Sequence, residues 1–143
     1  MLVAAVKTGF IKAIKTAFML LKIVLPIYAL VVIFRYSPGM ALLQDLFSPA
    51  MKLFNLPGDA IIPIITGFFT DEYGTIAVLS QLDLTAAQIT TVAMIVLVAH
   101  SVPVEAAIAQ KVGLNFVKFT TLRLVMAILI GLLIGWMGVL LSW

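Results

Sequence analysis

Ionisable and hydroxyl-bearing residues gather at two places in a chain that is otherwise strongly apolar. The stretch TGFFTDEYG, residues 66–74, holds two threonines, two adjacent carboxylates and two glycines. The stretch VLVAHSVPVEAAIAQ, residues 96–110, places an imidazole, a hydroxyl, a helix breaker and a carboxylate within six residues, namely His100, Ser101, Pro103 and Glu105. Carboxylates and imidazoles accept and donate protons and bind cations or hydroxyl-bearing ligands. Both stretches are therefore candidate ligand sites.

The composition places these polar stretches in a membrane protein. Hydrophobic residues make up 64% of the 143 residues and charged residues only 10%, whereas about a quarter of a soluble domain is charged. Mean hydropathy is +1.23, and apolar runs approach the span of about 20 residues that crosses a bilayer. We expect one all-α module over residues 1–143, a polytopic integral membrane protein with broken or re-entrant helices.

Charge and cysteine content narrow the function classes. The net charge is only +3, and the positive residues cluster near the ends of apolar runs, which suits membrane lipids better than nucleic acid. The chain has no cysteine, which excludes disulfides, thiolate metal sites and cysteine nucleophiles. We expect membrane lipids as contacts, no nucleic-acid partner, no resident cofactor and no resident metal.

The first third of the chain is predicted to contain one membrane span, flanked by helices that lie at the membrane surface. Residues 1–16 are predicted as a basic amphipathic interfacial helix that then turns into the bilayer as a first span over 17–34. The lysines before or at the start of this span place the N-terminus in the cytoplasm. Residues 37–59 contain three prolines, so two short interfacial helices broken at Ser48-Pro49 are expected, followed by a helix stop and restart at LPGD.

Residues 60–82 are long enough to cross a membrane but carry the first polar stretch near their centre. One interpretation is an ordinary loop between two short segments, with Asp71 capping the second. The other is a broken helix whose bend faces a water-filled cavity, because an Asp at a membrane helix centre costs about 2.5 to 3.5 kcal/mol and irregular backbone at that depth needs such surroundings. Freed amides at Thr70 and Asp71 would attract an anionic or carbonyl group of a ligand.

The second polar stretch is also predicted to interrupt a helix. Residues 86–99 are predicted to form a helix that ends at HSVP, and a new helix starts with Pro103 in its first turn and Ser101 or Val102 at or before its cap. His100 could be a satisfied core histidine and Glu105 a plain charge at a helix start. Two interrupted segments rich in ionisable groups, however, are typical of a transporter site between discontinuous helices.

The segments GFFTDEYGTIAVLSQLDLT and TTVAMIVLVAHSVPVEAAIAQKVGLN resemble the nucleoside recognition, or Gate, domain family of bacterial membrane proteins. That family includes spore-maturation-type proteins and modules within nucleoside and ferrous-iron transporters. The likeness covers roughly residues 15–142 and is strongest in LVAHSVPVEAAIAQKVG. Interruptions of this kind line the substrate route in the family, so the resemblance implies that role here for Gly67, Asp71, Glu72, His100, Ser101, Pro103 and Glu105. Thr66 and Thr70, in the same bend, complete the predicted substrate-binding set.

The last apolar run, from about Thr121 to Leu141, predicts the most regular span. Lys111, Lys118 and Arg123 favour a cytoplasmic start for it. Residues 60–118 should then cross a net odd number of times, for example as one broken span plus a re-entrant hairpin centred on HSVP. Alternatively, both broken elements are hairpins, or both cross. A stripe of small residues either mediates close helix packing, within the chain or in a dimer, or reflects the abundance of glycine in membrane helices; it comprises Gly131, Gly135 and Gly138.

We expect a transport module, not an enzyme, that binds and translocates a small polar solute or ion in the cytoplasmic (inner) membrane of a prokaryote. Three or four helical elements can scarcely surround a site, so we also expect a homodimer or higher oligomer, or a related Gate-like subunit as partner. One alternative is a non-transporting scaffold or regulatory subunit. Another is a divalent metal pathway through oxygen and nitrogen ligands, with His100, Asp71, Glu72 and Glu105 as the donors.

Overall fold

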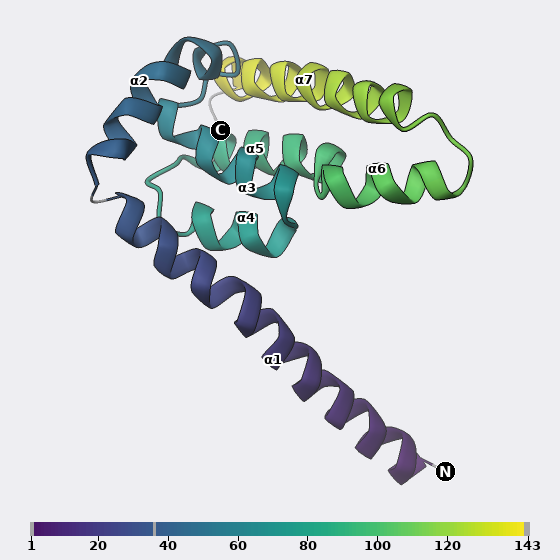
Figure 1. The fold of residues 1–143 in the computed structure, drawn as a ribbon. Coiled ribbons are helices and arrows are strands. Elements are labelled where there is room, and N and C mark those ends of the chain that lie inside the picture. The colour runs from purple at the N-terminus through teal and green to yellow at the C-terminus, as the bar shows by residue number, and fades with distance from the viewer. Residues whose placement is uncertain (1, 36, 142–143) are drawn as a thin grey trace.

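The computed structural model describes residues 2–35 and 37–141, and in these ranges the chain is helical and contains no strand (Figure 1). The expected all-α membrane fold is confirmed, since two segments are long and apolar enough to cross a bilayer, Ala86–Lys111 and Phe116–Leu141. The elements in chain order are α1 (Leu2–Arg35), α2 (Pro38–Lys52), the 3-10 turn η1 (Gly58–Ala60), α3 (Ile61–Phe69), α4 (Glu72–Leu79), α5 (Ala86–Ala99), α6 (Val102–Lys111) and α7 (Phe116–Leu141).

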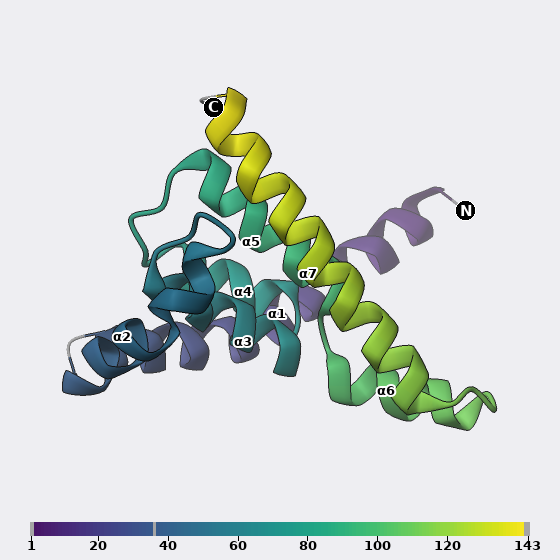
Figure 2. The same cartoon turned by 90° about the horizontal axis from the view of Figure 1, so that it is seen from above.

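Helices α5 and α7 form the centre of the helical body. They lie side by side and run in opposite directions (Figures 1 and 2). α3 packs against α5 and joins α4, which folds back against it, while α6 extends beyond α5 and also packs on α7. The core consists of apolar side chains from α5, α3, α7, the end of α2 and the segment after it, chiefly Val92, Ile95, Val96, Ile61, Ile64, Ala127, Met51 and Leu56.

The small-residue stripe on α7 belongs to this core. Gly131, Gly135 and Gly138 are all buried within the single chain. A Cβ added at Gly135 would overlap the backbone of Phe54, and one at Gly138 would lie 2.9 Å from Cβ of Ala87. Asn55 also donates from Nδ2 to the carbonyl of Gly135 (3.2 Å). The stripe therefore serves close packing inside the chain, and our suggestion that Gly131 and Gly135 form a dimer contact is wrong.

Helix α1 differs from its prediction. It continues from Leu2 to Arg35 through Pro26, with no turn between the segments expected at 1–16 and 17–34. Residues 10–25 contain neither glycine nor proline, so nothing in them ends a helix. α1 leaves the helical body at an angle and packs against α4 (Figure 1). For part of the predicted first span, the structure describes the helix but not the side chains.

The region after α1 also differs from its prediction. Instead of two helices broken at Ser48-Pro49, α2 runs through Pro49 to Lys52. A proline inside a helix costs one hydrogen bond, and packing compensates here because Met51, just beyond the proline, is buried in the core with 5% of its surface exposed. The predicted stop and restart at LPGD is confirmed, since η1 begins at Gly58 after Pro57.

The two predicted helix breaks occur, but their shapes differ from the example we gave. The break near HSVP is not the centre of a hairpin, because α6 continues away from α5 along α7. It is α3 and α4 that pack on each other as a helical hairpin. α7 starts at Phe116 rather than near Thr121, because the side chain of Asn115 accepts from the amide of Lys118 (3.1 Å) and caps the helix.

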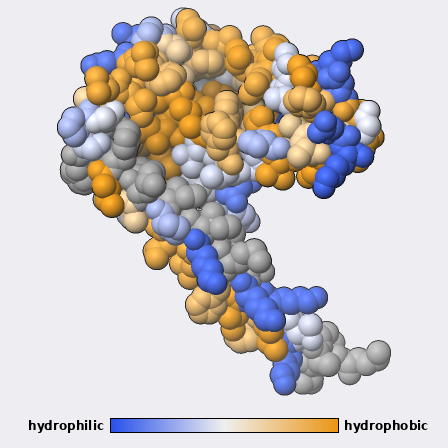
Figure 3. Space-filling view, viewed as in Figure 1, coloured by the Kyte–Doolittle hydropathy of each residue, from blue (hydrophilic) through white to orange (hydrophobic). Residues whose placement is uncertain are grey.

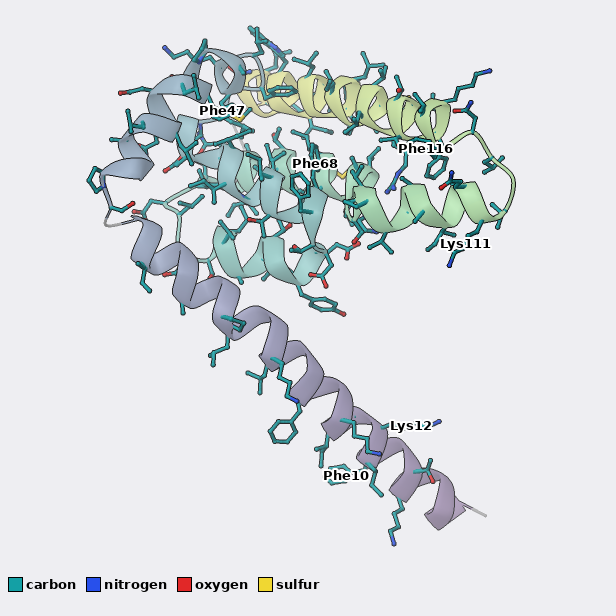
Figure 4. The ribbon with its side chains drawn as sticks, in the orientation of Figure 1. Phe10, Lys12, Phe47, Phe68, Lys111 and Phe116 are labelled. Atoms are coloured by element: carbon teal, nitrogen blue, oxygen red, sulfur yellow. The ribbon has the colours of Figure 1, made fainter. Side chains whose placement is uncertain are left out.

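The surface agrees with a membrane environment. Figure 3 shows mainly apolar side chains over the helical body, with hydrophilic side chains along α1 and at the end where α6 meets α7. Lys111 and Lys118 are exposed at that end. In Figure 4, Lys111 at the end of α6 and Phe116 at the start of α7 lie far from Phe47 of α2.

Candidate functional site

The two helix breaks, far apart in the sequence, meet in the structure. The backbone amide of Ser101 donates to the carbonyl of Gly67 (3.0 Å). The hydroxyl of Ser101 donates to the carbonyl of Thr70. The break after α5 thus uses its own donors to satisfy carbonyls at the end of α3, which have no partner within that helix. The polar residues of both stretches are held at one junction.

At the first break, side chains of the predicted types end α3 and start α4. The hydroxyl of Thr70 donates to the carbonyl of Thr66 (2.7 Å) and closes the last turn of α3. Asp71 caps α4, its Oδ1 accepting from the amide of Gly74 (2.9 Å), so the predicted capping role is confirmed. The amide of Thr70 donates to the carbonyl of Thr66 (2.8 Å), so one of the donors we expected to attract a ligand is already used.

The second break depends on an unusual backbone conformation at its cap. Ser101 is the N-cap of α6 and adopts a left-handed conformation (φ 47°, ψ 39°). This conformation is uncommon for residues other than glycine, and the two hydrogen bonds of Ser101 to the first break maintain it. Pro103 follows in the first turn of α6, as predicted.

Two carboxylates from different helices converge on one imidazole nitrogen. His100 Nε2 lies 3.3 Å from Oε1 of Glu72, at the start of α4, and 3.2 Å from Oε1 of Glu105, in the first turn of α6. The other ring nitrogen, Nδ1, lies 3.2 Å from the carbonyl of Leu97. The side chains of Glu72, His100 and Glu105 are 39%, 25% and 30% exposed, respectively. They form a partly accessible polar cluster.

Arg123 of α7 completes this cluster and was missed as a site residue. Its Nη1 donates to Oε2 of Glu105, and its Nε donates to the carbonyl of Val98 (2.9 Å). The guanidinium lies 5.6 Å from the ring centroid of Phe119, and the side chain is only 16% exposed. The sequence signal was a cation inside the start of an apolar helix, which we used for topology alone, although an ionisable residue in a membrane helix is a site candidate by default.

The structure separates the predicted set into two groups and leaves Pro103 outside both. Glu72, His100 and Glu105 belong to the polar cluster, together with Arg123. Thr66, Thr70, Asp71 and Ser101 hold the breaks through the hydrogen bonds described above, and Gly67 permits close packing, because a Cβ there would lie 2.5 Å from Thr75 Oγ1 and from Val96 Cγ1. Pro103 lies apart, exposed beside an open apolar depression on the outer side of α6.

A groove adjoins the cluster at Glu72. It has a volume of about 140 Å³ and runs between α4 and α5. Among the residues that the structure describes, Glu72 is the one charged residue in its lining, which otherwise consists of Thr75, Ile76, Leu79, Ala93, Val96 and Leu97. A ligand approaching through this groove would meet the Glu72 carboxylate as the first charged group of the cluster.

The geometry bears on two alternative chemistries. Among the described residues, no three His, Asp or Glu side chains are arranged to hold a metal ion, and one oxygen of Glu105 is paired with Arg123. The donor set we listed for a divalent metal does not assemble, because Asp71 caps α4 instead. Ser101 and His100 do not form a nucleophile and base pair either, since Ser101 Oγ donates to Thr70 while His100 Nε2 faces the glutamates.

Comparisons with known proteins identify the family of the chain. Residues 17–115, which include both helix breaks, match the Gate family, described as nucleoside recognition. The chain is 30% identical over 132 residues to the uncharacterized membrane protein YvoD of Bacillus subtilis (strain 168). The match covers 91% of this chain but 42% of YvoD, so the chain spans less than half the length of that relative. No solved structure matches the chain.

Proposed function

We propose that this chain, which belongs to the Gate nucleoside recognition family, is a membrane transport module that binds a small polar solute or ion at the junction of its two helix breaks. The observation that carries this function is the convergence of Glu72, His100, Glu105 and Arg123 from α4, the end of α5, α6 and α7. Transporter sites commonly form where interrupted helices meet near the middle of the bilayer.

The position of the cluster supports a binding role over a purely structural one. His100 and Ser101 interrupt Ala86–Lys111, a segment long enough to cross the membrane, so the cluster would lie near the bilayer midplane. Charged groups at that depth are costly and are typically retained for function. Partial exposure of Glu72 and Glu105 leaves their oxygens accessible to a ligand.

The same exposure favours an oligomer. A single chain leaves Glu72 39% exposed on a largely apolar body, where lipid contact would be unfavourable. A second copy of the chain, or a related Gate-like subunit, would cover the cluster and supply the second repeat that transporters use around a midplane site. We propose a two-fold homodimer as the working unit, since closed two-fold symmetry is the commonest solution.

We place the module in the cytoplasmic membrane of a prokaryote, with the N-terminus and the α6–α7 turn on the cytoplasmic side. The relative YvoD is a bacterial membrane protein. Lys111 and Lys118 flank that turn, and an excess of lysine and arginine in a short loop favours its retention in the cytoplasm.

Reconstitution into vesicles tests the transport function. The protein should accelerate uptake of at least one small polar solute or ion, and Glu105→Gln should reduce uptake per reconstituted molecule without changing oligomeric mass. Asp45→Asn, which neutralises an exposed carboxylate on α2, is the matched control and should transport normally. A protein that moves no solute in vesicles but co-purifies with another membrane protein would support the scaffold alternative.

The oligomer has its own test. Mass measurement in mild detergent and in native membranes should give a dimer or larger assembly. A monodisperse monomer that still transports would overturn the dimer and the shared site.

A further inference from the structure

We propose that Glu72, His100 and Glu105 hold one exchangeable proton, and that a monovalent cation binding at Glu72 displaces it. The inference deepens the proposed function by naming its substrate class, a singly charged cation, and the ion released in exchange. It rests on that function, because the exchange is useful only where the site opens to both sides of the membrane.

The contacts of His100 require one hydrogen on Nδ1 and a second proton between Nε2 and the neighbouring carboxylates. Nδ1 faces the carbonyl of Leu97 at 3.2 Å, and a carbonyl oxygen can only accept, so Nδ1 carries a hydrogen. Nε2 faces one oxygen of Glu72 and one of Glu105 at 3.3 and 3.2 Å. A bare nitrogen lone pair between two ionised carboxylates would be repelled by both. A second proton therefore lies between Nε2 and these oxygens, on the imidazole or on one carboxyl group.

The charge balance of the cluster also requires one additional proton. Arg123 neutralises one carboxylate, through its ion pair with Glu105, and it stays charged under all ordinary conditions. With a neutral imidazole, the second carboxylate leaves the cluster with one uncompensated negative charge. The extra proton makes the cluster neutral. Neutrality is strongly favoured where apolar helices surround the site, because an unpaired charge in such surroundings loses its hydration without compensation.

The charged side chains that the structure describes on the neighbouring elements do not supply this positive charge. Asp71, beside Glu72, is acidic and accepts from the amide of Gly74. The lysines of α1, the helix packed on α4, are exposed at positions 7, 12, 15 and 22. Lys111 at the end of α6 and Lys118 at the start of α7 are also exposed. α3 contains no titratable side chain. Within the described residues, the cluster thus balances its charge with a proton or an incoming cation.

Glu72 is the point of exchange. Its side chain is the most exposed of the four, at 39%, and it borders the groove between α4 and α5. A cation M⁺ that binds the Glu72 carboxylate displaces the proton shared by His100 Nε2 and the two carboxyl groups. This proton leaves to water, and the imidazole is then neutral with both carboxylates ionised. One positive charge enters and one leaves, so the cluster remains neutral. A divalent cation would leave an excess positive charge and is disfavoured.

Linkage between cation and proton binding provides the test. Purified full-length protein is titrated with NaCl, KCl and methylammonium chloride at several pH values, and binding is followed by thermal shift or calorimetry. If each bound cation displaces one proton, the apparent affinity for at least one of these cations rises about tenfold per pH unit over the range of exchange. In weakly buffered solution, a pH indicator should report release of about one proton per chain.

Two variants locate the proton. His100→Gln removes its carrier, so cation binding should persist and become independent of pH. Glu72→Gln leaves the neutral Glu105 and Arg123 pair, so both cation binding and proton release should be lost. Asp45→Asn should behave as the unmodified protein. Because Glu72 is partly exposed at the surface, Glu72→Gln remains interpretable even where His100→Gln fails to fold.

The outcomes separate this inference from the proposed function. Cation affinity that is independent of pH in the unmodified protein, or binding of none of the three cations, overturns the proton exchange. Uptake of another solute into vesicles would still support a transport module in that case. Absence of any transport in vesicles would instead count against the proposed function, whatever the binding titration shows.

Discussion

The amide of Ser101 donates to the carbonyl of Gly67 across a distance of 3.0 Å, and this bond joins two helix breaks that lie 34 positions apart in the sequence. The junction is dense as well as polar. Gly67 packs so closely against Thr75 and Val96 that any side chain at position 67 would collide with both. Packing and hydrogen bonding at Gly67 together set the distance between α4 and the end of α5, and hence between Glu72 and His100.

Gly67→Ala should destabilise the protein by about 1 to 3 kcal/mol, the usual cost of overpacking a filled core. Val96 is β-branched and rigid, and the Thr75 hydroxyl is held by the carbonyls of Pro63 and Asp71, so neither neighbour yields easily. Denaturant or thermal unfolding in detergent measures the change. Gly9→Ala is the control, because no heavy atom lies near that site and stability should not fall. Equal stability of the two variants would contradict close packing at the junction.

Glu105 and Arg123 should be energetically coupled. Glu105→Gln and Arg123→Gln each leave a charge without its partner, and each should cost about 1 to 3 kcal/mol of folding stability. In the double variant neither charge remains, so its cost should fall short of the sum of the single costs by about 1 kcal/mol or more. A double-mutant cycle on unfolding free energies checks this. Simple additivity would show that the ion pair contributes nothing to stability.

Gly135→Ala should affect folding and not association. An added Cβ would overlap the carbonyl group of Phe54, lying 2.8 Å from its carbon, and backbone cannot rotate away as a side chain can. We expect a loss of about 2 kcal/mol or more with an unchanged oligomeric mass. Gly131→Ala should cost less, because its Cβ would meet the flexible end of Ile95 at 2.6 to 2.7 Å. A change in oligomeric mass at preserved stability would return the stripe to an interface between chains.

Local chemistry explains which features the sequence could predict. α5 was predicted at its observed bounds, and both bounds are set locally: Thr85 and Gln88 form a capping box at its start and HSVP ends it. Asp71 was recognised as a cap residue because its side chain reaches an amide three positions further on, and the start of α6 was placed at Ser101 or Val102 because Pro103 follows directly. Such signals need no knowledge of the tertiary fold.

The remaining features depend on contacts between distant residues. Arg123 was not assigned to the site because its partners Glu105 and Val98 lie 18 and 25 positions away. α2 continues through Pro49 because the core buries Met51, and this packing overrides a local signal. The role of the α7 glycines became clear only when Phe54, Ile95 and Ala87 were located against them. The spacing of residues along the sequence does not reveal any of these contacts.

The path of the chain through the membrane can be tested with single cysteines, since the sequence has none of its own. α5 and α6 run from the 80–85 segment to the α6–α7 turn, and α7 runs back in the opposite direction (Figure 1). The 80–85 segment and the α6–α7 turn should therefore face opposite sides of the membrane. The lysines near the N-terminus and at the turn favour the cytoplasm. Lys12→Cys and Lys118→Cys should therefore react with an impermeant maleimide only from the cytoplasmic side, and Asp83→Cys, exposed in the opposite segment, only from outside. Permeabilised vesicles, in which all three variants should react, control for accessibility.

Labelling of Lys118→Cys from outside would overturn the proposed orientation. Labelling of Asp83→Cys and Lys118→Cys from the same side would show that the segment broken at His100 does not cross the membrane.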